Sequence, residues 1–329
     1  MKTLIKIPKD AELPLIGLVQ VGMIDRGTNL LQIRPTTICN LNCVFCSTDA
    51  GGLSRYHTTE YVVEKDYLLD WLKNIIKFKG SVHAFFDSVG EVLTYPKILD
   101  LLSEVSQLKG IKSLAFETNG TLLTEEIIKE LEEIKIDRIN LSLHALDEEI
   151  NKKLTGCTEY NTKRIVELLK FITRSKIEIC LTPVWVPGLN DQEIPKLIEL
   201  AKAEIKNKRF PILGIQKYEV HRFGRKPKGA RPISWYKFFG QLKKWEDEFK
   251  VKLKISPSEF GIEKARHLPF AFKIGERVMV EIRSQGWMLN EMIGVARQRS
   301  ITIVDCKESL NKLVKVRILR NRDNIYIAR

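Results

Sequence analysis

The sequence predicts an α/β protein: a partial (β/α)6 barrel, followed by a small C-terminal antiparallel β-barrel. Between residues 30 and 220, short β-rich runs alternate with amphipathic helical stretches, which is the pattern of parallel βαβ units. From residue 270 onward the pattern changes to short runs with period-two alternation and turn residues between them. That second pattern is typical of a small closed β-barrel.

Six strands are expected in the first part, and helices fill the intervals between them. One helical stretch has Leu68, Leu72 and Ile75 at helical spacing, and another has Ile165 and Leu169, so each has one apolar face. In barrels of this kind, functional residues collect at the C-terminal ends of the strands. The expected strands are Leu30–Arg34, Val82–Phe86, Ser113–Glu117, Arg138–Leu143, Ile177–Pro183 and Ile212–Tyr218.

We divide the chain into an N-terminal extension (1–29), the α/β core (30–220), a linker (221–269) and the C-terminal barrel (270–329). The linker starts with the basic, Gly- and Pro-containing run 221–232, which predicts a loop, and continues with an expected helix from Ser234 to Phe249. The expected barrel strands lie in Phe272–Ile282, Ile301–Val304, Leu313–Ile318 and Ile325–Ala328.

The composition of the chain indicates which kind of partner it can bind and in which compartment it is expected. The 329 residues include 54 Lys and Arg against 41 Asp and Glu, a net charge of +13, which favours an acidic partner such as nucleic acid. A lysine-rich enzyme with a solvated surface is the alternative. The N-terminus has no apolar export segment and no run reaches the length of a membrane span, so we expect a cytoplasmic protein without a membrane partner.

Three of the six cysteines, Cys39, Cys43 and Cys46, lie in one run with the spacing C-x3-C-x2-C. Thiolates this close can share one metal centre, and soft sulfur ligands suit an iron–sulfur cluster. Three ligands on a four-iron cluster leave one iron open to a small molecule. The alternative is zinc, but structural zinc sites normally have four ligands, and the run contains no fourth Cys or His.

The run resembles the cluster motif of the radical S-adenosylmethionine (SAM) superfamily, in which an aromatic residue such as Phe45 precedes the last cysteine. The resemblance implies a [4Fe-4S] cluster whose open iron chelates SAM. It also implies an electron donor such as ferredoxin or flavodoxin, and cleavage of SAM to a 5′-deoxyadenosyl radical. A reducing compartment suits such a cluster.

Four further segments resemble SAM-binding motifs of the superfamily, in the expected order at strand ends. The turn Asp87–Pro96 is similar to its Gly-Gly-Glu turn, although Val89 replaces the first glycine. An ordinary βα turn, a helix-entry turn and a structural histidine are the alternatives for individual segments. The residues that the resemblance implies for SAM binding are Phe45, Gly90, Glu91, Thr118, Asn119, Ser142, His144, Val184 and Leu189.

The C-terminal segment resembles a TRAM domain, a small RNA-binding barrel, through Ile274-Gly275-Glu276, Gly286-Trp287, Gly294 and Ile325–Ala328. An unrelated OB-like or SH3-like barrel is the alternative. Together with the basic loop, this resemblance predicts a row of cations that contact RNA phosphates. The alternative is a solvated loop that binds no RNA. The predicted RNA-binding residues are Arg222, Arg225, Lys226, Lys228, Arg231, Arg317, Arg320 and Arg322.

The layout as a whole is similar to the archaeal radical SAM enzymes that methylate a carbon of the tricyclic wyosine base at position 37 of tRNA-Phe. Peptide-modifying members carry many C-terminal cysteines, whereas this chain has only Cys306 there. Methylthiotransferases carry three more cysteines before the cluster run, whereas no cysteine precedes Cys39 here. Both classes are therefore disfavoured, and a tRNA substrate is expected.

The string Ser142-Leu143-His144-Ala145 resembles the radical methylases of RNA adenine, which use two further cysteines. We expect Cys157 and Cys306 to be the methyl carrier and the resolving cysteine, whereas Cys180, in mid-strand, is expected to be a buried small apolar residue. The open alternatives are another RNA-base reaction such as ring formation, a small-molecule or protein substrate, and an RNA-binding protein whose cluster is structural.

Overall fold

The computed structural model describes residues 2–329, and the contacts within it divide the chain into two compact units. The first unit contains the segment up to Ile38, Ser54–Ser113 and Glu263–Arg329, and the second contains Cys39–Leu53 and Leu114–Ile262. Because this division follows contacts rather than sequence continuity, the domain boundaries predicted above stay a prediction. No helix within residues 2–329 is long and apolar enough to cross a membrane.

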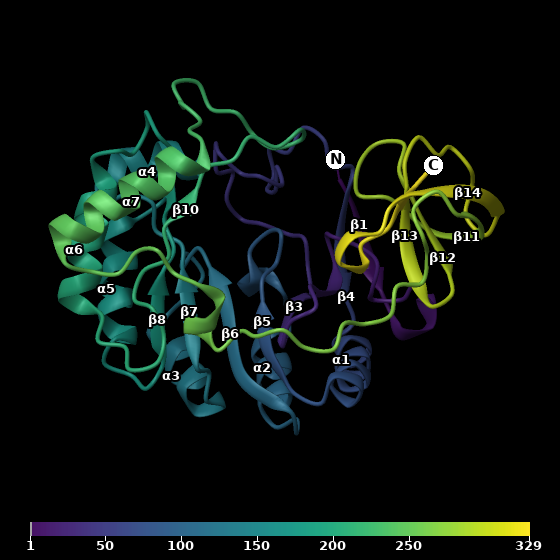
Figure 1. Cartoon of the computed structure of the whole chain (residues 1–329), viewed down its shortest axis with the longest axis horizontal. Coiled ribbons are helices and arrows are strands. Elements are labelled where there is room, and N and C mark those ends of the chain that lie inside the picture. The colour runs from purple at the N-terminus through teal and green to yellow at the C-terminus, as the bar shows by residue number, and fades with distance from the viewer. Residues whose placement is uncertain (1) are drawn as a thin grey trace. The chain divides into compact units, whose positions relative to one another are not determined.

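The α/β part of the first unit is built on three strands in the order β2-β3-β5, of which β3 and β5 are labelled in Figure 1. Strand β2 is antiparallel to β3, and β3 is parallel to β5. Beside them, β1 pairs with β4 in parallel. The strands are β1 (Thr3–Ile7), β2 (Gly22–Asp25), β3 (Leu30–Arg34), β4 (Thr59–Val63) and β5 (Val82–Phe86), and the helices are η1 (Lys9–Ala11), α1 (Lys65–Lys79), η2 (Val92–Thr94) and α2 (Ile98–Ser106).

The second unit contains a parallel run of strands in the order β6-β7-β8, and α5 and α6 lie outside β8 in Figure 1. A separate two-stranded pair joins β9 and β10. The strands are β6 (Ile111–Thr118, which begins in the first unit), β7 (Arg138–Leu141), β8 (Glu178–Leu181), β9 (Val184–Trp185) and β10 (Gln216–Lys217). The helices are α3 (Glu125–Ile134), α4 (Glu148–Thr155), α5 (Thr162–Ile172), α6 (Glu193–Glu204), α7 (Trp235–Phe249) and η3 (Pro257–Phe260).

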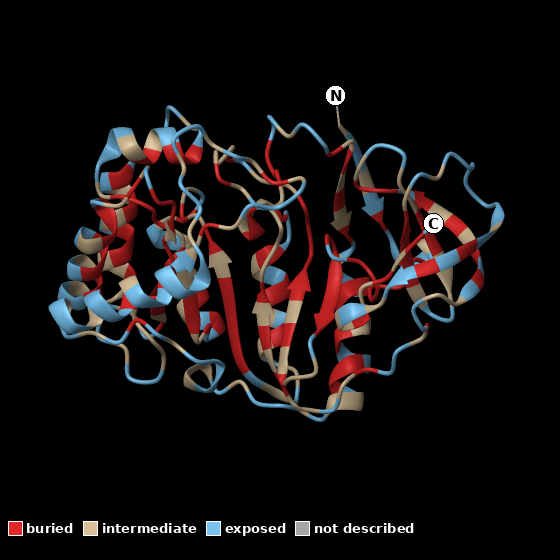
Figure 2. Ribbon diagram, turned by 45° about the horizontal axis from the view of Figure 1, so that its top comes forward, coloured by how far each residue is buried: buried red, intermediate tan, exposed pale blue. Residues whose placement is uncertain are grey.

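The ends of these helices follow from local side-chain chemistry. Thr124, Asp147, Asn161 and Ser234 each precede a helix and accept a hydrogen bond from the amide three residues on, which satisfies a donor that the helix leaves unpaired. Ser234 thereby fixes the start of the predicted helix α7. Figure 2 shows buried residues concentrated on the strands and exposed residues on the outer sides of the helices.

Five strands of the first unit form a closed barrel in the order β11-β12-β13-β15-β14. All neighbouring pairs are antiparallel except β13 and β15, which are parallel. Its core includes Val280, Ile301 and Tyr326, and the Phe272 and Tyr326 rings meet edge to face at 5.0 Å. The elements are β11 (Arg277–Gln285), β12 (Met292–Ala296), β13 (Arg299–Ile303), β14 (Leu313–Arg320), η4 (Arg322–Asn324) and β15 (Ile327–Ala328).

The sequence pattern located β3 and β5 to the residue, and the sixth strand is present only in a shortened, interrupted form. Of Ile212–Tyr218, Leu213 forms an isolated parallel bridge with Leu181 of β8, and Gln216–Lys217 forms β10, which pairs with β9; the pairing is interrupted between them. Pro183 explains this, because it lacks an amide donor and ends β8, so the chain restarts as β9. The strands β1, β2, β4, β9 and β12 had not been predicted, and β2 makes the sheet mixed rather than purely parallel.

A fully buried ion pair ties α1 to the segment that leads into the barrel of the first unit. Lys79 Nζ lies 2.9 Å from Asp25 Oδ1, and both side chains have no exposed surface. Asp25 also accepts the amides of Gly27 (3.0 Å) and Leu268 (2.7 Å), and Lys79 donates to the Arg266 carbonyl. Each charge is therefore paired and hydrogen-bonded, as a buried charge must be.

Removing one member of this pair leaves a buried charge without compensation. We expect Lys79→Met to lower the free energy of unfolding by about 3–5 kcal/mol. Adding Asp25→Asn removes the stranded charge and keeps an acceptor for one of the two amides, so the double variant should lose less stability than the sum of the two single variants. Urea unfolding of the four proteins measures this, and strictly additive losses would contradict it.

Candidate functional site

The three-cysteine run lies on a loop, Cys39–Leu53, which we call the cluster loop and which belongs to the second unit. Backbone hydrogen bonds from Asn42 N to Thr155 O (3.0 Å) and from Val44 N to Leu154 O (2.8 Å) fasten it to the end of α4. Gly156 has a left-handed φ of 61°, and a Cβ there would collide with the Asn42 carbonyl. The loop is therefore held through backbone groups, which leaves its thiols available.

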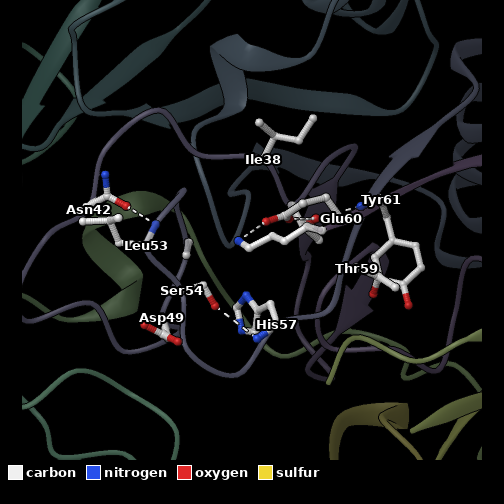
Figure 3. A network of polar contacts seen from close by, with 12 residues as sticks. Ile38, Asn42, Asp49, Leu53, Ser54, His57, Thr59, Glu60 and Tyr61 are labelled. Carbon is white, nitrogen blue, oxygen red and sulfur yellow. Dashed lines mark hydrogen bonds and ion pairs between the residues drawn. The ribbon is translucent and has the colours of Figure 1, made fainter. Parts of the chain in front are cut away.

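Three further contacts close the cluster loop. The Asn42 carboxamide oxygen accepts the Leu53 amide at 2.7 Å, which joins the two halves of the loop (Figure 3). The Cys46 sulfur lies 3.3 Å from the Ala50 amide and 3.3 Å from the Thr48 hydroxyl. Hydrogen bonds of this kind stabilise a thiolate and tune an iron–sulfur cluster.

The electrostatics of the three thiols fit a cluster. Burial raises the pKa of Cys43 well above its ordinary value, the thiolates of Cys39 and Cys46 raise it further, and the Arg225 guanidinium opposes them. Iron ions would relieve this repulsion. Within residues 2–329 no three His, Cys, Asp or Glu side chains converge as ligands of a single metal ion, but in a cluster each thiolate binds a different iron, so convergence on one point is not required.

The turn with Gly90 and Glu91 lies in the first unit, against the residue that precedes the first cysteine. A Cβ at Gly90 would collide with the Ile38 carbonyl, so only glycine fits there. The Glu91 amide donates to the same carbonyl at 2.8 Å, and the Glu91 side chain, 2% exposed, accepts the Leu93 amide. This turn thus packs on the backbone that leads into Cys39.

The predicted residues at the ends of β6 and β7 make polar contacts within the second unit. Asn119 donates to the Asn40 side chain at 3.0 Å, which links the end of β6 to the cluster loop. Thr118 accepts the Gly120 amide, and the Ser142 hydroxyl donates to Glu117 at 3.2 Å. Their side chains are therefore ordered by neighbours at the C-terminal ends of the strands.

His144 is buried (5% exposed) and its Nδ1 accepts the Val184 amide at 3.1 Å. Burial lowers its pKa to about 4, so the imidazole is neutral at physiological pH. Its ring meets the Phe45 ring edge to face, with centroids 4.8 Å apart. Phe45, Val184 and Leu189 belong to one apolar cluster, so the predicted SAM residues His144, Phe45, Val184 and Leu189 are brought together.

An open cavity of about 430 Å³ adjoins the cluster loop. Val44, which lies between two of the cysteines, lines it together with Leu154 and Leu189. Lys153 and Lys228 add two cations to this otherwise apolar lining. The cavity can thus take an apolar or aromatic group next to an anionic one.

The non-cluster cysteines have different environments. Cys157 is half-buried and follows the α4 end on which the cluster loop is docked. Cys306 is half-buried in the first unit, between β13 and β14, where its amide donates to Asn290 O and its side chain packs on the barrel core. Cys180 lies in β8 and is 1% exposed, and burial raises its pKa to about 12, which confirms the prediction of a buried apolar role.

The predicted RNA-binding residues divide into two groups. Most of them are exposed: Arg222, Lys226, Lys228 and Arg231 in the second unit, and Arg317, Arg320 and Arg322 in the first. Arg225 differs, because its side chain is only 14% exposed and its guanidinium contacts the cluster loop. No sequence pattern could indicate this contact, because Arg225 and Asp49 are 176 residues apart.

Comparison with known proteins matches residues 33–201 to the radical SAM superfamily. The chain is 40% identical over 339 residues to an uncharacterised protein of Methanocaldococcus jannaschii, covering 96% of this chain and 78% of that protein. It is 31% identical over 184 residues to a GTP 3′,8-cyclase of Clostridium botulinum, covering 54% of each. The chain thus spans about half the length of the cyclase.

Two solved structures share the fold. SuiB of Streptococcus suis aligns with a TM-score of 0.52 at 19% identity, over 69% of this chain and 50% of that one. Methylornithine synthase (PylB) aligns with a TM-score of 0.50 at 14% identity, over 68% of this chain and 63% of that one. At these identities the likeness concerns the fold alone.

The depressed pKa of His144 predicts acid destabilisation of the protein without its cofactors. Between pH 6.5 and about 4 the unfolded state binds a proton that the folded state does not, so the free energy of unfolding should fall across this window by up to about 3 kcal/mol. His144→Asn keeps an acceptor for the Val184 amide but does not titrate. Urea unfolding at pH 7, 5.5 and 4 should show a smaller loss in the variant, and equal losses in both proteins would contradict this account.

Proposed function

Because the chain belongs to the radical SAM superfamily, we propose that it is an RNA-modifying enzyme that methylates a carbon of a tRNA base. The specific substrate that we propose is the wyosine-type guanosine at position 37 of tRNA-Phe. The observation that carries the proposal is in the second unit, where a run of exposed cations is joined directly to the cluster loop through Arg225.

In this proposal Cys39, Cys43 and Cys46 hold the [4Fe-4S] cluster that the superfamily uses together with SAM. When bound, these cofactors supply one-electron chemistry that can act on an unreactive carbon. Phe45, Val184 and Leu189 give an apolar wall for the adenine of SAM, and neutral His144 holds the Val184 backbone in place. The polar residues proposed for SAM are Gly90, Glu91, Thr118, Asn119 and Ser142.

Exposed aromatic side chains support RNA as the substrate. Just after the basic run, at the start of α7, Trp235 is 52% exposed and Tyr236 is 88% exposed, and Phe239 stacks on Trp235 at 5.5 Å. Lys217 lies 4.9 Å from the Trp235 ring centroid. Proteins bind single-stranded RNA by stacking bases on such rings while cations contact the phosphates.

The C-terminal barrel supports the same proposal. The outward face of β14 carries Lys315, Arg317 and Arg320, and Arg277 of β11 is the register partner of Arg317. Such a small closed barrel with a cationic face suits RNA phosphates. We therefore propose that it acts as a TRAM-like RNA-binding barrel and that Arg317, Arg320 and Arg322 contact RNA.

For the methylation itself we propose Cys157 as methyl carrier and Cys306 as resolving cysteine. Cys157 is half-buried beside the docked end of the cluster loop, and a half-buried thiol can meet both a cofactor and a substrate. We expect Cys157→Ala to keep SAM cleavage and to abolish base methylation, whereas Cys180→Ala, which changes a buried thiol in β8, should keep both. Full methylation by the Cys157 variant would remove Cys157 from the proposal.

A second candidate is a radical enzyme that acts on a free purine nucleotide. The similarity of the core to a GTP 3′,8-cyclase favours it. The same experiment separates the two candidates: nucleoside mass spectrometry of tRNA from cells with and without the gene. Loss of a methylated tricyclic guanosine, with accumulation of its demethyl precursor, supports the first candidate, and an unchanged tRNA profile contradicts it.

The salt dependence of tRNA binding tests the exposed cations. Changing Arg222, Lys226 and Lys228 to Gln removes three candidate phosphate contacts, so the slope of log K against log salt should become shallower by about 2. A matched control changes Lys163, Arg174 and Lys176, which are also exposed and lie in the same unit. If the slope changes equally in both triple variants, the cations of the basic run do not form the RNA track.

A further inference from the structure

The basic run His221–Arg231, which we call the basic strap, is fastened to the cluster loop by one residue. Arg225 Nε lies 2.7 Å from Asp49 Oδ1, Nη1 donates to Cys43 O at 2.9 Å, and Nη2 donates to Ala50 O at 2.6 Å. The Arg225 amide also donates to Cys46 O at 2.9 Å. A single arginine thus binds four groups that are spread over the loop from Cys43 to Ala50.

These contacts are buried and specific to the guanidinium. Asp49 is 1% exposed, and Arg225 gives its carboxylate a counter-charge. The planar fork of arginine can reach a carboxylate and two carbonyls at once, which a lysine ammonium cannot do in a fixed geometry. A Cβ at the preceding Gly224 would lie 2.9 Å from Ser47 O, which shows how closely the strap approaches the loop.

The basic strap is also anchored beyond Arg225. The Tyr218 hydroxyl donates to the Arg225 carbonyl at 3.2 Å, and the Arg231 amide donates to Pro187 O at 2.7 Å. A Cβ at Gly188 would collide with the Gly229 carbonyl. Between these anchors, Lys226 and Lys228 are exposed. The strap is therefore held at Arg225 and at Arg231, and the segment between these residues presents cations to solvent.

We infer that Arg225 is a positioning residue that couples the basic strap to the cluster loop, so that cluster binding orders the strap. The cluster fixes the loop through Cys39, Cys43 and Cys46, and Arg225 transmits this order, because three of its four acceptors are groups of Cys43, Cys46 and Asp49. Such coupling is reciprocal, so Arg225 must also favour cluster retention. The inference rests on the cluster site and does not require RNA as substrate.

Hydrogen–deuterium exchange with and without a reconstituted cluster tests the coupling without an activity assay. In the natural protein, peptides covering residues 222–231 should exchange about fivefold or more slowly once the cluster is bound. Arg225→Gln loses the three guanidinium contacts and keeps only the backbone bond to Cys46 O, so most of this protection should be lost. Arg174→Gln, which changes an exposed cation of the same unit, should behave like the natural protein. Undiminished protection of the strap in Arg225→Gln, or no protection in the natural protein, would overturn the inference.

The midpoint potential of the cluster shows whether Arg225 acts through its charge or through the geometry of its hydrogen bonds. Arg225→Gln removes a positive charge beside the buried Asp49 carboxylate and the cluster loop, so the potential should shift to a more negative value. Arg225→Lys keeps the charge and should keep the potential, although it should lose most of the strap protection because it lacks the fork. Adding Asp49→Asn to Arg225→Gln should bring the potential back. Equal potentials in all four proteins would contradict a role for this pair.

If Arg225→Gln does not fold, hydrogen–deuterium exchange is measured on Arg225→Lys and Asp49→Asn instead. In each of these variants, cluster binding should protect the strap less than in the natural protein. Full protection in both would overturn the inference. A failure of RNA binding would affect only the proposed function, because neither exchange nor potential is measured with RNA present.

Discussion

The docking of the cluster loop on the end of α4 is the constraint on which the candidate site depends. Three thiols must be presented without using their own side chains as anchors, so the loop is held by its backbone. The Asn42 and Val44 amides find acceptors at Thr155 and Leu154, and Gly156 permits the close approach. Arg225 secures the loop further by donating to the Cys43 and Ala50 carbonyls.

Much of the fold could be predicted because the apolar pattern of each element matches its burial. In β5, Val82, Ala84 and Phe86 are buried while the residues between them are half-buried, so period-two alternation located the strand to the residue. The pattern of apolar residues did not predict strands that are very short or whose place depends on where a neighbouring strand ends. Strand β9 has two residues and exists because Pro183 ends β8, and no apolar periodicity can signal such a pair.

The candidate site likewise has features that the local sequence predicts and one that only a long-range contact explains. The cysteine spacing and the Gly90–Glu91 turn are local, and the structure explains the glycine by its approach to the Ile38 carbonyl. The role of Arg225 is not local. Within a run of five exposed or half-exposed cations, only the tertiary fold distinguishes the arginine that faces the buried Asp49 from those that face solvent. Sequence alone therefore assigned all of them to RNA.

We propose that the three-cysteine loop serves radical chemistry on RNA. The most direct test is the rate of 5′-deoxyadenosine formation from SAM by the reconstituted, reduced protein, with and without tRNA that lacks the modification. We predict that the three cysteines are required for any cleavage and that unmodified tRNA accelerates it, while fully modified tRNA does not. Cleavage that is indifferent to tRNA, but that increases with a free purine nucleotide, would contradict the claim.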